Sequence, residues 1–281
     1  MKRVTAPVRI DISGGWPDSD PYRRDFGGAV LNAAINHRVS AQLDAPNLTT
    51  SLGNVPKSSG LGTSGALRAT YLVASNDSLI QDRMDLVRRV HRFENEVLNQ
   101  RAGFQDEAAA IYGGVNYWDF GQNGAIRRYE IPREQARHLE THLVLVHIGE
   151  DHLSSNIHNL VFGPGNYEKN IPRLDRMKEI AKLMTRNPSD FYQMASLINE
   201  TWDLQRALHS SIETKTMRKL QSKLKSYYSA CRATGAGGGG CIIFYTDNRE
   251  RLAKAAADLQ DKMPNMKVIP FQFDYEGIRI E

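Results

Sequence analysis

The 281-residue sequence is short of cysteine and of long hydrophobic runs, and each absence excludes a class of protein. Two cysteines, Cys231 and Cys241, are too few for a disulfide framework or for a zinc site of their own. The longest apolar runs, such as 143–146 and 241–245, have the length of strands and are too short to cross a bilayer. The opening segment lacks the apolar stretch of a signal peptide. We therefore expect a cytoplasmic, reducing location and no membrane partner.

A basic stripe with interleaved aromatic residues is also missing, which argues against nucleic acid as a partner. The 36 Lys and Arg residues exceed the 32 Asp and Glu residues, and the resulting net charge of +4 suits an anionic ligand as well as many proteins without one. The composition, 41% hydrophobic and 24% charged, is that of an ordinary globular protein, and the length leaves room for two compact domains.

Strand-like and helix-like patterns alternate in an irregular order, which is typical of the α+β class. Strands are expected at 3–13, 115–119, 142–148, 241–245 and 267–273, and 29–43 is a strand or a helix–strand unit. Helices are expected at 66–74, 82–100, 105–112 and 249–262, and the stretch 167–233 has an almost wholly helical pattern. The polar stretch 121–137 is the best boundary, so we predict an N-terminal domain over 1–135 and a C-terminal domain over 136–281.

Two glycine-rich segments are candidates for ligand contact. The loop 56–66 contains Gly60, Gly62 and Gly65 and opens into a helix, where free backbone N–H groups attract phosphate. It is not a Walker A loop, because no Gly-Lys-Ser/Thr closes it. The segment 234–241 has four consecutive glycines, which favours close approach of the backbone to a bound group or to another loop. Taken singly, the two segments also fit a capped turn and a tight connection.

Acidic residues stand beside further glycines. Asp106 follows Gly103, Glu94 and Glu96 lie on the helix before it, and Asp18 follows a strand that ends in two glycines. Phosphoryl transfer requires a metal held by oxygen ligands, positive groups on the phosphates and a carboxylate near the attacking hydroxyl. These residues are suited to those roles. Taken singly, however, Asp18 fits a turn residue equally well, and most acidic residues on a helix, such as Glu94 and Glu96, simply face water.

The order and spacing of three motifs, at 6–18, 56–66 and 234–241, resemble the GHMP kinases over nearly the whole chain. Within that superfamily the segments 14–18, 103–110 and 270–277 are most similar to the sugar 1-kinases, above all the D-glycero-D-manno-heptose-7-phosphate kinases, with fucokinase and the galactokinase-like enzymes nearby. The resemblance implies an N-terminal domain like domain 2 of ribosomal protein S5 and a ferredoxin-like C-terminal domain. The active site would lie in the cleft between them.

The resemblance also implies a role for each matching residue. Asp106 would orient or deprotonate the attacking hydroxyl, with Arg9 beside the transferred phosphoryl group. Mg²⁺ would be held by Ser64 and Glu94, with Glu96 as the alternative ligand. The ATP phosphates would be wrapped by Lys57, Ser58, Ser59, Gly60, Leu61, Gly62, Thr63 and Ser64. The sugar would be held by Asp18, Gly14, Gly15, Trp16, Gly237, Gly238 and Gly239.

The sequence therefore predicts an ATP- and Mg²⁺-dependent kinase that phosphorylates the anomeric C1 hydroxyl of a heptose, a heptose 7-phosphate or a related sugar. Two alternatives stay open: a GHMP kinase for a non-sugar alcohol, and an inactive GHMP-fold ligand sensor. The motive for the second is the short interval 18–56, which lacks the strands and loop that help hold adenine in this superfamily. Lys57 and the pair Arg23 and Arg24 fit either a second substrate phosphate or plain surface. A homodimer also stays open.

Overall fold

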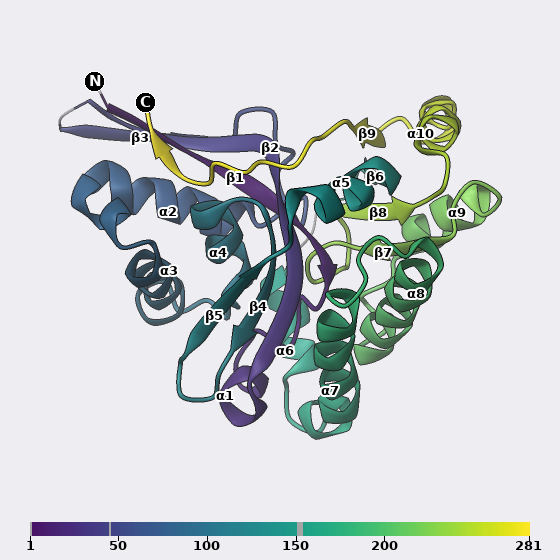
Figure 1. The fold of residues 1–281 in the computed structure, drawn as a ribbon, viewed down its shortest axis with the longest axis horizontal. Helices are drawn as coiled ribbons and strands as arrows, with labels where there is room; N and C mark the ends of the chain where they lie inside the picture. The colour runs from purple at the N-terminus through teal and green to yellow at the C-terminus, as the bar shows by residue number, and fades with distance from the viewer. Residues whose placement is uncertain (1, 45, 151–153) are drawn as a thin grey trace.

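The structure is a computed structural model that describes residues 2–44, 46–150 and 154–281, and within these ranges the chain forms two antiparallel sheets with helices packed against them (Figure 1). The first sheet has six strands in the order β10-β1-β2-β4-β5, with β3 paired to β2. Its strands are β1 (Lys2–Ser13), β2 (Gly28–Asp44), β3 (Asn47–Ser51), β4 (Val115–Phe120), β5 (Ile126–Glu130) and β10 (Arg279–Ile280). Because β10 pairs with β1, the end of the chain returns to the sheet in which it began.

Helices from both halves of the chain cover this sheet. One face carries α2 and α4, and Figure 1 shows α7 and α8 on the opposite side. The helices and turns of the N-terminal half are α1 (Tyr22–Phe26), α2 (Thr63–Ser75), η1 (Asp77–Gln81), α3 (Arg83–Arg92), the π-helical turn η2 (Phe93–Val97) and α4 (Gln105–Tyr112). Strand β1 is buried continuously from Val4 to Ser13 instead of alternating, which is what a strand covered on both faces requires.

The second sheet has four strands in the order β7-β8-β6-β9. Its strands are β6 (Leu143–His147), β7 (Ala230–Ala233), β8 (Cys241–Tyr245) and β9 (Lys267–Ile269). The remaining helices are α5 (Arg133–His142), α6 (Ser154–Val161), α7 (Tyr167–Met184), α8 (Phe191–Leu208), α9 (Lys215–Leu224), α10 (Arg249–Ala257) and η3 (Gln260–Lys262). Counted along the chain, the strands lie side by side as second, third, first and fourth, which is the order of a ferredoxin-like unit. The expected α+β class and C-terminal architecture are therefore confirmed.

Several expected elements differ from the structure. Residues 230–233 form strand β7, so the wholly helical interpretation of 167–233 is wrong at its end; pairing with β8 overrides the local pattern. The expected helix 82–100 ends as an α-helix at Arg92 and continues as the π-helical turn η2. Strands β3 and β5 and helix α5 were not expected, because few of their residues are buried. The proposed boundary between residues 135 and 136 falls inside α5.

Helix length and composition bear on the membrane question. None of the helices in the described ranges is both long and apolar enough to span a bilayer.

Candidate active site

A cavity of about 310 Å³ lies where the two halves of the chain meet. Its walls come from Arg9 on β1, the segment 58–64, the segment 100–106 and the pair Gly235 and Ala236. The first three belong to the N-terminal half, and the last lies between β7 and β8 of the second sheet. The cavity thus joins the glycine segments 56–66 and 234–241, which are far apart in the sequence.

The loop 56–66, which leads into α2, supplies residues 58–64 to one wall of this cavity. Gly62 caps α2 with φ of 71°, and Gly62, Thr63 and Ser64 line the cavity, so the first turn of α2, whose N–H groups have no partner within the helix, borders it. A Cβ at Gly65 would lie 2.8 Å from the Cβ of Asp106, so only glycine lets α2 and α4 approach this closely. The hydroxyls of Ser59 and Thr63 are buried and have no partner among the described residues, which leaves them available to a ligand.

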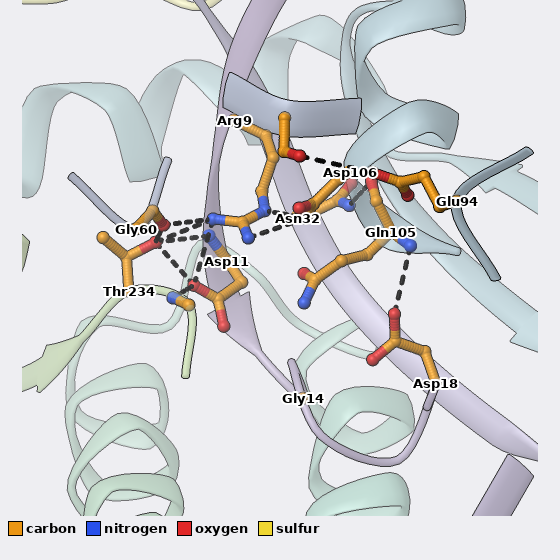
Figure 2. Close-up of polar contacts among 12 residues, drawn as sticks. Arg9, Asp11, Gly14, Asp18, Asn32, Gly60, Glu94, Gln105, Asp106 and Thr234 are labelled. Carbon is orange, nitrogen blue, oxygen red and sulfur yellow. Dashed lines mark hydrogen bonds and ion pairs between the residues drawn. The ribbon is translucent and has the colours of Figure 1, made fainter. Parts of the chain in front are cut away.

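Arg9 and Asp106 form an ion pair at the centre of the site (Figure 2). The Nη2 and Nε atoms of Arg9 lie 2.7 and 2.8 Å from Oδ1 of Asp106. The Nη1 atom of Arg9 donates to the carbonyl of Gly60 at 2.6 Å, so the same guanidinium also holds the loop 56–66. Desolvation lowers the pKa of Arg9, but the nearby carboxylates of Asp106 and Asp11 outweigh it and raise this pKa, so Arg9 carries a positive charge.

Asp11 joins the two halves of the chain behind that pair, although the sequence interpretation assigned it no role. Its Oδ1 accepts from the hydroxyl of Thr234 at 2.6 Å and from the N–H of Gly235 at 2.7 Å. Its Oδ2 accepts from Nη2 of the fully buried Arg232 at 3.0 Å. The sequence carries little signal for this role, because the burial of Arg9 and Asp11 is visible only in the structure, where both faces of β1 are covered and charged side chains must find partners.

Asp18 forms the opposite wall and is only 1% exposed. Its Oδ2 accepts from the backbone N–H of Gln105 at 3.0 Å, while its Oδ1 has no partner among the described residues. The backbone carbonyl of Gln105 accepts from Asn32, whose own carbonyl oxygen accepts from the indole N–H of Trp118. Burial raises the pKa of Asp18 to about 7, with the charge of Asp106 adding to the effect.

Ser64 and Glu94 lie together at the edge of the cavity, with Oγ and Oε1 3.4 Å apart. The guanidinium of Arg68 contacts both oxygens, so a positive group already occupies the space between the two expected metal ligands. These oxygens fit Mg²⁺, which uses one or two protein oxygens together with substrate phosphates. The described residues contain no cluster of three or more His, Cys, Asp or Glu that would form an all-protein metal cage. Glu96 is exposed, pairs with Arg92 at 3.9 Å and does not line the cavity.

Burial leaves this corner rich in carboxyl groups. Desolvation raises the pKa of Glu94 in spite of Arg68, and it raises the pKa of the fully buried Glu107 well above its usual range. His91 faces Glu107 at 3.3 Å, and burial lowers the pKa of His91 to about 4. Neither Glu107 nor His91 was singled out from the sequence. The charges of Glu94 and Asp106 add to the rise in the pKa of Glu107, so a positive group at Glu94 relieves repulsion among these acids.

Not every residue expected to touch a ligand lines the cavity. Of those expected from the sequence, the structure places these on its walls: Arg9, Gly15, Asp18, Glu94, Asp106 and Ser58 to Ser64. Lys57 is exposed outside it, and Trp16 is buried against His158 and Phe162. The carbonyl of Gly14 accepts from Arg232.

The part of the glycine run that was expected to touch the sugar lies outside this cavity. Gly237 and Gly238 pack against Ile212 and Ile157, and neither they nor Gly239 lines the cavity. The two ends of the glycine run, Gly235 and Gly240, instead lie against the loop 56–66. A Cβ at Gly235 would lie 2.8 Å from the carbonyl oxygen of Gly60, and one at Gly240 would lie 2.5 Å from that of Ser59. Glycine is therefore needed there for contact between two loops.

Comparison with known proteins gives the family context of this geometry. The family models of the GHMP kinases N terminal domain and the GHMP kinases C terminal domain match residues 30–114 and 169–265, which together exceed half of the chain. The D-glycero-alpha-D-manno-heptose 7-phosphate kinase of Campylobacter jejuni is 23% identical over 99% of this chain and 98% of its own length.

A second relative is longer than this chain. The L-fucokinase/L-fucose-1-P guanylyltransferase of Bacteroides fragilis is also 23% identical, over 92% of this chain, but the match spans only 36% of that protein. Among solved structures, a D-glycero-D-manno-heptose 1-phosphate kinase from Bacteroides thetaiotaomicron superposes with a TM-score of 0.76 at 21% identity, covering 100% of this chain and 99% of the other. The fold is thus shared over the full length.

Proposed function

This chain belongs to the GHMP kinases, and from that premise we propose that it transfers the γ-phosphoryl group of ATP to a hydroxyl group of a sugar. One observation carries the proposal: the Arg9–Asp106 pair contacts the anion-binding loop on one side, and Asp18 lies across the same cavity. A phosphoryl donor bound at the loop and a hydroxyl acceptor bound at Asp18 would therefore meet at Asp106.

The proposed reaction needs little covalent chemistry from the protein. The sugar hydroxyl oxygen attacks the γ-phosphorus, the bond from that phosphorus to the β-phosphate oxygen breaks, and the hydroxyl proton passes to Asp106. The Oδ2 atom of Asp106 is suited to receive it, because Arg9 occupies only Oδ1. The charge on the transferring group is stabilised by Arg9 and by the N–H groups at the start of α2. When bound between Ser64 and Glu94, Mg²⁺ would neutralise charge on the phosphate oxygens.

The charge around Asp18 favours a sugar over an alcohol that carries a carboxylate. Asp18 forms no ion pair with any described lysine or arginine, so a ligand carboxylate buried beside it would find no cation to pair with. A sugar hydroxyl instead donates a hydrogen bond to it. The name of the Bacteroides fragilis relative couples fucokinase to L-fucose-1-P, which supports the anomeric C1 hydroxyl as the acceptor. Arg101, on the exposed rim, is available to a phosphate already on the sugar.

The test is turnover of Mg²⁺-ATP by the purified chain with L-fucose, D-galactose, D-glycero-D-manno-heptose 7-phosphate and mevalonate. ADP release measures the rate, and phosphorus NMR locates the new phosphate. We expect transfer to C1 of at least one sugar, and loss of it in Asp106→Asn. Turnover of mevalonate alone would replace the sugar with another alcohol. A wild-type protein that binds these ligands but is as inactive as Asp106→Asn would be a sensor.

A further inference from the structure

Gln105 lines the cavity with a side-chain oxygen that accepts no hydrogen bond from the described residues. It is 5% exposed, it lines the cavity beside Asp18 and Asp106, and its Oε1 has no partner among the described residues. Figure 2 shows the side chain extending into the space between Asp11 and Asp18, without a dashed line to its amide. A buried acceptor without a partner destabilises the protein, so a ligand that supplies the missing donor gains from binding there.

The structural role of Gln105 is carried by its backbone alone. Its N–H donates to Asp18 at 3.0 Å and its carbonyl accepts from Asn32 at 3.1 Å. Neither bond needs an amide side chain. The glycine at position 15 also leaves space for the amide, since a Cβ there would lie 3.3 Å from Nε2 of Gln105. The side chain is therefore free to take a role that the backbone does not.

Gln105 also lies next to the reacting position. It directly precedes Asp106 at the start of α4, and the Oδ1 atom of Asp18 is a second buried acceptor without a partner. Two acceptors and one amide donor at one wall match a group that offers adjacent hydroxyls. A phosphate or carboxylate has no such pair of donors at neutral pH.

We propose that the side-chain amide of Gln105 and the Oδ1 atom of Asp18 form hydrogen bonds with a substrate hydroxyl next to the one that is phosphorylated. Gln105 is therefore a specificity-determining residue. This inference rests on the proposed sugar kinase activity and narrows it. The substrate class is an aldose with a free hydroxyl on the carbon adjacent to the acceptor carbon. For a C1 acceptor that hydroxyl is at C2.

The test compares wild type with Gln105→Met, which keeps the length of the side chain but removes its hydrogen bonds, and with Gln105→Asn, which keeps the amide but withdraws it by one methylene. Gln193→Met, an exposed change on α8, is the control. The probe is the sugar of the turnover panel that wild type uses fastest, measured beside each of its monodeoxy forms. KM for ATP and the melting temperature are recorded for every variant.

We expect both Gln105 variants to raise KM for the sugar by about ten- to a hundredfold while KM for ATP stays constant. Wild type should discriminate against one monodeoxy sugar by a similar factor, and both variants should lose that discrimination. Variants that keep the wild-type KM and the wild-type discrimination would overturn the role of Gln105 and leave the kinase activity standing. If wild type itself turns over no sugar, the proposed function fails first, and this inference fails with it.

Discussion

Asp106 and Asp18 are carboxyl groups of the same cavity, yet their surroundings are opposite. The Asp106 side chain is 29% exposed and pairs with Arg9 at 2.7 Å, on the wall that contacts the loop 56–66. Asp18 is 1% exposed, forms no ion pair among the described residues, and has its pKa raised to about 7 by burial. We call the side of the cavity around Arg9 and Asp106 the charged wall, and the side around Asp18 the neutral wall. The charged wall is suited to a charged ligand, and the neutral wall to a neutral ligand with hydroxyl groups.

Because of this difference, substitutions on the two walls should affect different properties of the protein. Changes at the charged wall should alter turnover and metal use, because those depend on charges held in place. Changes at the neutral wall should alter sugar affinity and stability, because those depend on desolvation. The following experiments test that division.

The largest effect is expected for Asp106→Asn. The amide cannot take the hydroxyl proton, so kcat should fall by about 10²- to 10⁴-fold while KM for the sugar changes little. Steady-state kinetics with the accepted sugar measure both constants. Asp119→Asn, in an exposed pair with Arg127, is the control and should behave like wild type. A kcat within threefold of wild type would remove Asp106 from the reaction.

Glu94→Gln and Ser64→Ala should weaken metal binding by about 10- to 100-fold, because each removes an oxygen ligand or its charge. Electron paramagnetic resonance of Mn²⁺ in the presence of ADP measures binding without turnover. Glu96→Gln is the matched control, since Glu96 lies two residues away and is exposed. Equal Mn²⁺ binding in Glu94→Gln and Glu96→Gln would contradict the assigned ligands.

Arg68→Gln should have the opposite sign. The Arg68 guanidinium contacts both Ser64 and Glu94, so a metal ion must displace it, and its removal should lower the half-saturating Mg²⁺ concentration by about fivefold. The same Mn²⁺ titration checks this, with Arg92→Gln on α3 as the control. Weaker metal binding in Arg68→Gln would mean that Arg68 assists the metal instead of competing with it.

The smallest effect is on stability, and it concerns Asp18. The folded protein keeps the Asp18 proton up to about pH 7, whereas the unfolded chain releases it near pH 3.8, so this group stabilises the fold less as pH rises between those values. Asp18→Asn has no such proton, and its melting temperature should exceed that of wild type by several degrees at pH 8 and by less at pH 5. Thermal denaturation at both pH values measures this difference in melting temperature. A difference that is independent of pH would show that burial does not raise the pKa of Asp18.

The two walls also differ in how far their residues could be predicted from the sequence. On the charged wall the sequence singled out Arg9, Asp106, Ser64 and Glu94, which the structure brings to one cavity, but it missed Asp11 and Arg68. The bounds of α4 and β8 match the expected 105–112 and 241–245. Glycine-rich turns and helix starts are local features, so they can be recognised in one sequence. Strands β3 and β5 were missed because they are largely exposed and polar, and β7 because only its pairing with β8 makes it a strand.

The neutral wall was predicted less completely. Asp18 was expected to hold the sugar, but its burial, its raised pKa and the free amide of Gln105 depend on segments that meet only after folding. Of the glycine run, only Gly235 lines the cavity, next to Ala236, while Gly237 to Gly239 do not. The run could not be resolved from sequence, because every glycine in it has the same local freedom and only the partner loop distinguishes them.

By itself, then, the sequence determined the family, the two glycine segments and the acids beside them, since these are set by backbone conformation over a few residues. The tertiary structure alone decided that Asp11 ties Arg232 and Thr234 to the first strand and that Arg68 lies between Ser64 and Glu94. It also decided that Asp18 is buried without an ion pair in the part of the chain that the structure describes. The physical reason is that desolvation and ion pairing depend on which distant side chains share a buried volume.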